Sequence, residues 1–149
     1  MDFDPKQTSY ESLLKMFWNS HDSTACHNRQ YMSAIFYHSD EQKRLAEQTK
    51  EEHQKKVSRP IATKILPAET FYDAEDYHQK YLLRNHRGLL SSLSLTAGEI
   101  RESHIATRLN GYVGGYGSMD NFNKEAEKLG VSEDQINYVR QIINRGPMH

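Results

Sequence analysis

The chain has 149 residues, a length that fits one domain with a sizeable core, and its mean hydropathy is −0.86. Nineteen Lys and Arg against twenty Asp and Glu give a net charge of −1, which argues against a nucleic-acid binder or an anionic-membrane binder. No apolar run approaches the roughly 20 residues of a membrane span, and no signal-peptide pattern opens the chain. One cysteine cannot form an internal disulfide, so we expect an intracellular, cytoplasmic protein.

A helix, a loop and a strand are predicted in the first 37 residues. Residues 10–19 carry apolar residues at helical spacing and are expected to form a short amphipathic helix, with Ser9 in the N-cap position. Residues 21–29 are expected to be a loop. Aromatic and β-branched residues dominate 31–37, which predicts a strand that begins at Tyr31.

A polar helix is predicted over 39–56. Ser39 is a suitable N-cap, and Gln42 stands three residues further on, which is the spacing of a capping box. The segment holds only two apolar residues, so we expect the helix to lie mostly in solvent. A strand-like run follows over 61–67 and ends at a proline.

Only helical signals follow residue 78. Apolar periodicity predicts helices over 89–95, 97–109, 119–129 and 133–144. Ser118 and Ser132 are expected N-caps, and Thr96 with Glu99 has the spacing of a capping box. This part of the chain is therefore predicted to be all-helical.

The composition changes near residues 85–88, where mixed strand and helix signals give way to helical ones. We therefore predict an α/β domain over 1–86 and a helical C-terminal extension over 87–149. The glycine-rich run 111–117 follows a predicted helix and lacks the pattern of a phosphate loop, so it is interpreted as a joint between helices.

The densest group of chemically useful side chains lies in the segment 71–81, which holds four aromatic rings, one imidazole and three acids. Such a mixture is poor core and poor linker. It follows the strand-like run 61–67, and a strand end that leads into such a segment is a common way to place a site, so we predict the wall of a polar pocket. The residues assigned to this pocket are Phe71, Tyr72, Glu75, Asp76, Tyr77 and His78.

Three motifs, in order, resemble the peptide methionine sulfoxide reductase A (MsrA) family. Residues 74–79, Ala-Glu-Asp-Tyr-His-Gln, resemble the family's downstream signature. Residues 3–22 resemble its passage from Tyr-Asp-Pro through a helix to Phe-Trp and His-Asp, and residues 30–37 resemble its Gln-Tyr-Arg-Ser-Ala-Ile strand. The resemblance covers roughly the first 85 residues and implies a ferredoxin-like α/β sandwich.

The family's nucleophile is a cysteine in a Gly-Cys-Phe-Trp motif, which these 149 residues do not contain. The glutamate before the family's Tyr-Asp-Pro and the aspartate of its Gly-Asn-Asp run are absent as well. We therefore expect a truncated or divergent member, with a partial sandwich that lacks the first strand and helix. Its helical extension resembles that of some animal members. Such a sheet would have an unpaired edge and would need a compensating partner or lose stability.

The family chemistry needs a thiolate that attacks the sulfoxide sulfur while an acid protonates the departing oxygen. Cys26 is the only thiol, and its neighbours His27 and Arg29 would favour the thiolate; the alternative is an incidental loop cysteine. The resemblance implies that Tyr31 contacts the sulfoxide oxygen, and the alternative is an ordinary strand tyrosine. For His78 the alternative to proton transfer is a structural role.

The resemblance implies thiol-dependent repair of methionine S-sulfoxide in oxidised proteins, that is, peptide-methionine (S)-S-oxide reductase activity. The reductant would be thioredoxin or dithiothreitol, with no bound cofactor. Because the nucleophile motif is missing, we expect impaired activity or none; the alternative is a catalytically dead isoform or fragment that acts at most as a binding module. The eight histidines lack metal-site spacing, so no metal is expected.

Overall fold

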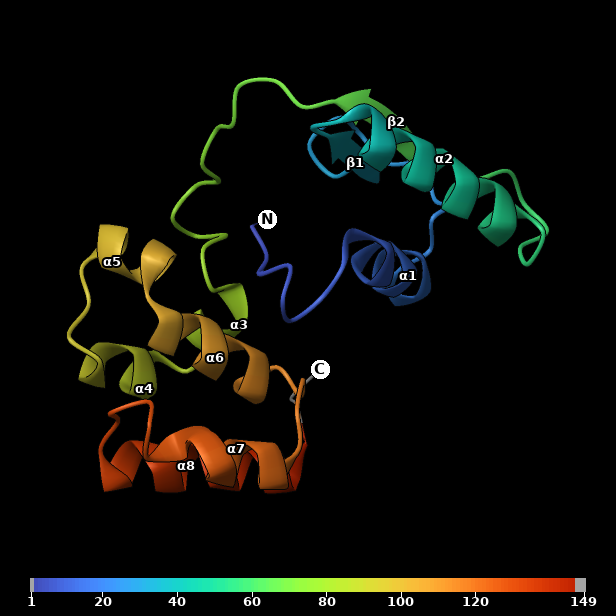
Figure 1. Ribbon diagram of the computed structural model, residues 1–149. Coiled ribbons are helices and arrows are strands. Elements are labelled where there is room, and N and C mark those ends of the chain that lie inside the picture. The colour runs from blue at the N-terminus through green and yellow to red at the C-terminus, as the bar shows by residue number, and fades with distance from the viewer. Residues whose placement is uncertain (1, 147–149) are drawn as a thin grey trace. The chain divides into compact units, whose positions relative to one another are not determined.

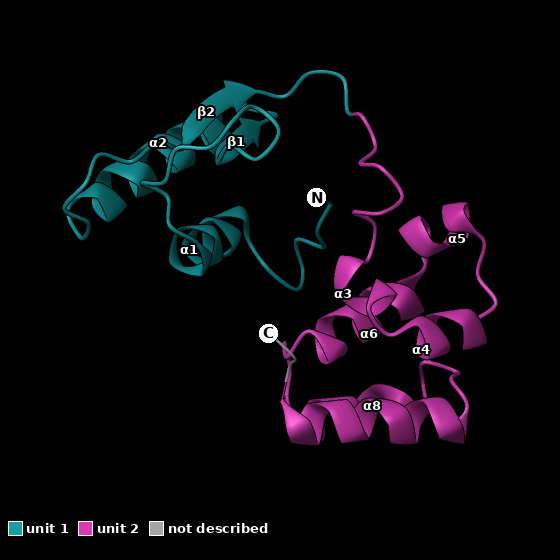
Figure 2. Cartoon of the chain, turned by 180° about the vertical axis from the view of Figure 1, so that it is seen from behind, with its two compact units in different colours: residues 1–71 teal, residues 72–149 magenta. Residues whose placement is uncertain are grey.

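The computed structural model describes residues 2–146, and the chain divides into two compact units, Met1–Phe71 and Tyr72–His149 (Figure 2). We call them the α/β unit and the helical unit. The expected domain boundary between residues 86 and 87 stays a prediction. Of the helices in the described part of the chain, none has the length and apolar character needed to cross a membrane.

The α/β unit is built around one strand–helix–strand connection (Figure 1). Strands β1 (Ala34–Tyr37) and β2 (Lys64–Pro67) pair in parallel, with Ala34 opposite Lys64, and helix α2 (Asp40–Gln54) connects them. Parallel strands need such a crossover because the chain must return to the same edge before the second strand begins. Helix α1 (Tyr10–Ser20) precedes the sheet and packs on α2.

A small core holds these elements together. Its buried residues are Leu14, Trp18, Ile35 and Ala46. The indole Nε1 of Trp18 donates a 2.9 Å hydrogen bond to the Thr49 hydroxyl, which joins α1 to α2. Ala46 is the only buried residue of α2, so the prediction of a helix that lies mostly in solvent is confirmed.

Within residues 72–146, the described part of the helical unit, there are six short helices. They are α3 (Tyr81–Arg84), α4 (Arg87–Ser92), α5 (Ala97–Glu102), α6 (His104–Val113), α7 (Met119–Ala126) and α8 (Glu133–Arg145). Their core is larger, and its buried residues are Leu83, Leu89, Ala106, Leu109, Tyr112, Val113, Phe122, Ala126, Leu129, Ile136 and Val139. The rings of Tyr112 and Phe122 meet edge to face at 4.9 Å, which joins α6 to α7.

The predicted N-caps at four helix starts are confirmed. Ser9, Ser118 and Ser132 each accept a hydrogen bond from the backbone three residues on, and Thr96 forms a full capping box with Glu99. The reciprocal half of the box predicted at residue 39 is wrong, because the Gln42 side chain accepts from the His38 N–H instead.

Several boundaries differ from prediction. The helix predicted over 89–95 is observed as α4, two residues earlier at its start and three at its end, and the helix predicted over 119–129 ends at Ala126. Each strand is three residues shorter at its start, so Tyr31 lies in a turn and not in a strand. The helix predicted over 97–109 is broken at Ser103, which is extended (ψ 121°) and caps α6 with its side chain. Helix α3 was not predicted; it begins after Lys80, which has a positive φ of 53°.

Candidate functional site

The loop between α1 and β1 carries both residues that the family chemistry singles out in the α/β unit. Cys26 is exposed. The side chain of Tyr31 is exposed as well, at 57%. The Tyr31 N–H donates to the Asn28 carbonyl at 3.1 Å, which closes the turn that replaces the predicted start of the strand. A thiol and a phenol are thus presented from one short, solvent-facing loop.

A chain of hydrogen bonds fixes the base of this loop. His21 Nδ1 lies 2.8 Å from the Phe17 carbonyl, and its Nε2 lies 2.7 Å from the Ser33 hydroxyl, which shares a 2.8 Å bond with the Thr63 hydroxyl. Since a carbonyl only accepts, Nδ1 carries the proton. Both ring nitrogens of His21 have partners, so this imidazole fixes the end of α1 to the start of β1.

The hydroxyls of Ser33 and Thr63 belong to this hydrogen-bond chain, and neither residue was predicted to lie near a site. Each stands one residue before its strand, and the parallel register places them opposite each other. Thr63 is 1% exposed, and its carbonyl accepts a 3.0 Å bond from the Lys50 amine. A hydroxyl residue at the same position before two parallel strands was the available signal.

Asp22 stabilises the first turn of the loop. Its carboxylate accepts a 2.6 Å bond from the Thr24 hydroxyl and a 3.0 Å bond from the Thr24 N–H, and it forms a 2.8 Å ion pair with Arg59. These bonds, the Thr24 hydroxyl first, lower the pKa of Asp22 below its ordinary value. The loop therefore carries a fixed negative charge four residues before Cys26.

The second group of predicted site residues lies in the segment after β2. Phe71 and Tyr72 are 84% and 82% exposed, and Glu75, Asp76 and Tyr77 are exposed as well. Their predicted role as the wall of a pocket stays a prediction. This arrangement leaves the three aromatic rings and two carboxylates named here exposed to solvent.

His78 ends this segment and is half-buried. Its N–H donates to the Glu75 carbonyl at 2.9 Å, and its ring lies 4.2 Å from that of Tyr77, centroid to centroid. The Gln79 side chain closes the same turn by donating to the Ala74 carbonyl at 3.0 Å. The signature residues thus form a compact turn with several internal bonds.

The two groups of residues lie beyond opposite ends of the strands. Tyr31 precedes β1 by three residues, whereas Phe71 follows β2 by four. In a parallel pair of four-residue strands, the start and the end of the strands are on the order of 10 Å apart. Cys26 and Tyr31 belong to the α/β unit, and Tyr72–His78 belong to the helical unit.

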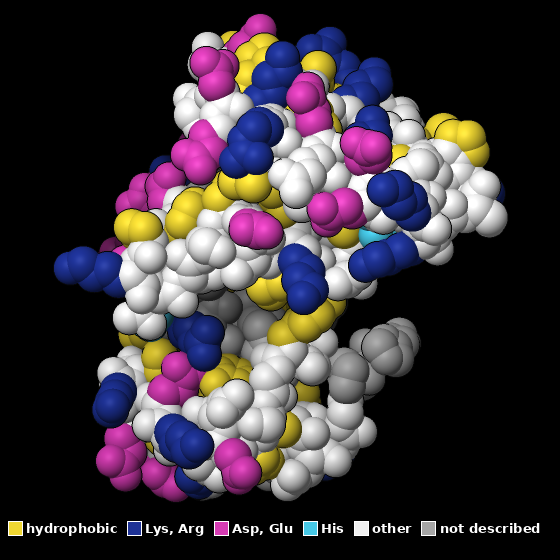
Figure 3. All heavy atoms as spheres, turned by 45° about the vertical axis from the view of Figure 1, so that its right-hand side comes forward, with side chains coloured by type: hydrophobic (Ala, Val, Ile, Leu, Met, Phe, Trp, Pro, Cys, Tyr) yellow, Lys and Arg dark blue, Asp and Glu magenta, His cyan; other side chains and the backbone are white. Residues whose placement is uncertain are grey.

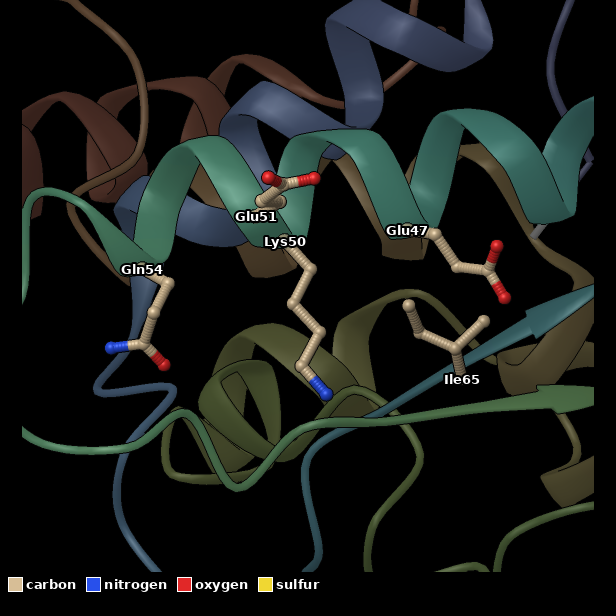
Figure 4. Close-up of a pocket in the computed structure, with 5 residues that line it drawn as sticks. All are labelled: Glu47, Lys50, Glu51, Gln54 and Ile65. Atoms are coloured by element: carbon tan, nitrogen blue, oxygen red, sulfur yellow. The ribbon is translucent and has the colours of Figure 1, made fainter.

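Two hollows lie elsewhere on the α/β unit. One, between α2 and β2, is lined by Glu47, Lys50, Glu51, Gln54 and Ile65 (Figure 4). The other lies beside the starts of α1 and α2, and its lining includes Phe3, Tyr10 and Leu45. In the first, the Lys50 amine points toward β2 and is bonded to the Thr63 carbonyl, so this charge serves the fold.

The described surface has no metal-binding group: no three His, Cys, Asp or Glu side chains within residues 2–146 are grouped closely enough to hold an ion. On the face shown in Figure 3, side chains of both charges are interspersed, with hydrophobic side chains between them. This face carries no patch of a single charge, in agreement with the net charge of −1.

An ion pair that no sequence pattern indicated lies beside the signature segment, residues 74–79. Arg101 on α5 contacts Asp73 at 2.5 Å, and the Lys80 amine donates to the Arg101 carbonyl at 2.9 Å. The partners are 28 and 21 residues apart, so no local pattern indicated the pair.

Comparisons with known families agree with this two-part architecture. The family described as peptide methionine sulfoxide reductase matches residues 1–109. The family described as selenoprotein methionine sulfoxide reductase A, helical domain, matches residues 94–144. The fold thus defines a mixed α/β part with a small parallel sheet, followed by a helical C-terminal part.

Individual relatives agree as well. The chain is 43% identical to a peptide methionine sulfoxide reductase of Drosophila melanogaster, over 93% of this chain and 57% of the relative. It is 43% identical to peptide methionine sulfoxide reductase A1 of Arabidopsis thaliana, over 58% of this chain and 46% of the relative. It is 44% identical to peptide methionine sulfoxide reductase MsrA of Methanosarcina acetivorans, over 61% of this chain and 52% of the relative.

The chain therefore belongs to the peptide methionine sulfoxide reductase family. It spans about half the length of the curated relatives that it matches. The resemblance drawn from three sequence motifs is confirmed, and the alignment with the Drosophila relative extends into the helical unit.

Proposed function

We propose that this chain acts in the thiol-dependent reduction of methionine S-sulfoxide in oxidised proteins, with thioredoxin as the physiological reductant and dithiothreitol as its substitute. Membership of the family supports the reaction class. The observation that carries the proposal is the turn over 74–79, which keeps the family signature and presents its carboxylates and Tyr77 ring to solvent.

The reaction transfers one oxygen atom. A thiolate attacks the sulfoxide sulfur, the oxygen is protonated, and methionine leaves while the thiol becomes a sulfenic acid. Two reductant thiols then convert the sulfenic acid back to a thiol, with loss of water and formation of a disulfide. Within these 149 residues Cys26 is the one side chain able to take the thiolate role.

The exposed segment supports recognition of an oxidised methionine side chain. Its aromatic faces suit the methyl-sulfur end of the side chain, and Tyr77 has a hydroxyl for the polar oxygen. We assign the substrate contacts of this segment to Phe71, Tyr72, Glu75, Asp76, Tyr77 and His78. For Tyr31 of the α/β unit, whose side chain is exposed, the family resemblance implies a contact with the sulfoxide oxygen, which we propose separately.

A second candidate is binding without turnover. The exposure of Cys26 favours it, because a reactive cysteine normally stands in a partly covered site, whereas this thiol is exposed in a loop of the α/β unit. In this role the chain would hold an oxidised segment for a thiol supplied by another molecule.

One assay separates the two. Purified chain is incubated with a peptide that contains methionine S-sulfoxide and with dithiothreitol, and the methionine formed is measured beside Cys26→Ser. Turnover that disappears in the variant establishes reduction through Cys26. Binding of the sulfoxide peptide without turnover establishes the second candidate, and absence of both overturns the proposal.

Two controls sharpen the assay. The R-sulfoxide peptide should be neither reduced nor bound, because a fixed site distinguishes the two epimers at sulfur. The double variant Tyr72→Ala, Tyr77→Ala should weaken binding by about tenfold, as expected when exposed aromatic contacts are removed. Equal binding of both epimers would show that the peptide is held by a general hydrophobic contact.

A further inference from the structure

We propose that Arg101 of the helical unit is a positioning residue for the signature segment, residues 74–79. It holds both ends of this segment and thereby raises the affinity of the segment for methionine sulfoxide. The inference deepens the proposed function and rests on it for the identity of the ligand. Arg101 lies outside the three motifs that carried the family resemblance.

The geometry is a clasp around residues 74–79. At the start of the segment, the Arg101 guanidinium contacts the Asp73 carboxylate at 2.5 Å. At its end, the Lys80 amine donates to the Arg101 main-chain carbonyl at 2.9 Å. One residue of α5 therefore fixes both ends of the six-residue signature.

The backbone conformation of Lys80 makes the end of the segment depend on the bond between the Lys80 amine and the Arg101 carbonyl. The Lys80 φ of 53° is in the left-handed region, where a residue with a side chain is normally disfavoured. A non-glycine residue persists there only when its surroundings hold it. The bond from Lys80 to Arg101 is one such restraint, and a second is the 2.7 Å bond from Arg84 Nε to the Gln79 carbonyl.

Arg101 is in turn carried by an anchored helix. Thr96 and Glu99 cap α5 with reciprocal bonds, and Ile100, the preceding residue, is buried at 7% exposure. The Arg101 side chain is 40% exposed and also lies 3.4 Å from Glu102. It can thus turn toward either carboxylate without disturbing the core, which is suitable for a residue that tunes a neighbouring segment.

Hydrogen exchange tests the clasp without any ligand. In Arg101→Ala the backbone amides of His78 and Gln79 should exchange about three to five times faster, the range that an exposed ion pair supports. Arg101→Lys should restore most of the protection, and 1 M salt should bring the unmodified chain toward the alanine variant, because salt screens exposed charges. Lys80→Met removes the amine that donates to the Arg101 carbonyl and keeps a side chain at the positive φ, so it should release the end of the segment alone.

Arg140→Ala is the matched control. Arg140 lies in the same unit, its side chain is 38% exposed, and it is ion-paired with Glu133 on α8 at 3.7 Å. It should leave exchange over 74–79 unchanged. Combining Asp73→Ala with Arg101→Ala should add little to either single change, since both remove one interaction. Arg101→Ala keeps the main-chain carbonyl that accepts from Lys80, so unchanged exchange in this variant would overturn the role of the Arg101 side chain at the start of the segment. Unchanged exchange in Lys80→Met would overturn the contact at its end.

Binding of the methionine S-sulfoxide peptide, measured by calorimetry, is the second readout. Arg101→Ala should weaken it about fivefold, and Arg101→Lys should recover it. Faster exchange with unaltered binding would overturn the tuning role and leave a structural bond. If the unmodified chain does not bind the peptide, the proposed function fails, and the exchange result still decides whether the clasp exists.

Discussion

The two units differ in how they obtain their stability. Among the described residues, eleven buried hydrophobic residues form the core of the helical unit, and four form that of the α/β unit. Helices satisfy their own backbone hydrogen bonds, whereas a parallel pair of strands leaves its outer edges open. No third strand pairs with β1 or β2 within residues 2–146.

This difference has a functional consequence. A two-stranded sheet is marginal by itself and depends on the helices packed on it. The signature residues 74–79 belong to the better-packed helical unit, while Cys26 and Tyr31 belong to the smaller-core α/β unit. The proposed ligand-binding segment thus belongs to the unit with the larger core, and the thiol belongs to the unit with the smaller core.

The substitution with the largest predicted effect lowers the stability of the helical unit alone. Phe122 is fully buried, so Phe122→Ala should lower the free energy of unfolding of this unit by about 3–5 kcal/mol. The loss should shift the urea transition followed by circular dichroism at 222 nm. It should leave the fluorescence transition of Trp18, the only tryptophan, in place.

Phe71→Ala is the control for this change. Its ring is 84% exposed, so neither transition should move. If Phe122→Ala shifted the two transitions together, the units would unfold as one, and the comparison between them would be wrong.

The next prediction concerns the bond between α1 and α2. Thr49→Val removes the acceptor of the Trp18 indole N–H and should cost the α/β unit about 1 kcal/mol. The fluorescence transition of Trp18 measures it. Thr107→Val is the matched control and is followed by circular dichroism at 222 nm, because Thr107 lies in the helical unit. The hydroxyls of Thr49 and Thr107 both donate to the carbonyl four residues before them, and Thr107 is exposed. A loss of equal size in the control would assign the effect to the shared bond within each helix.

The sequence predicted helix starts better than strand lengths, for a physical reason. A cap such as Ser132 is decided within four residues, so local sequence contains the information. The length of β1 depends on its partner: pairing begins at Ala34 opposite Lys64, and the preceding residues Ser33 and Thr63 bond through their side chains. The strand predicted from Tyr31 was therefore too long.

The candidate site was predictable in composition and not in geometry. The mixture of rings and acids over 71–78 and the family resemblance were visible in the sequence. The high exposure of Phe71 and Tyr72 depends on tertiary packing, which a single sequence does not show. The contact between Asp73 and Arg101 joins residues 28 apart, and local periodicity carries no signal at that separation.

The smallest predicted effect is a pH dependence confined to the helical unit. His86 is 8% exposed, and its Nδ1 lies 2.9 Å from the Tyr138 hydroxyl. Burial lowers the pKa of His86 below its ordinary value of about 6.5. Between the lowered pKa and about 6.5 the unfolded chain binds more protons than the folded one, so stability should be complete above this window and fall as the pH falls through it.

Urea unfolding followed at 222 nm from about pH 7.5, one unit above the ordinary pKa, down to about pH 5 measures this dependence. The difference between the unmodified chain and His86→Leu isolates the contribution of His86, because the other histidines of the described chain are not buried. Tyr138→Phe removes the hydroxyl and keeps the imidazole covered, so it should retain the pH dependence that burial causes. Parallel curves for the unmodified chain and His86→Leu would show that the imidazole is equally hydrated in the folded and unfolded states.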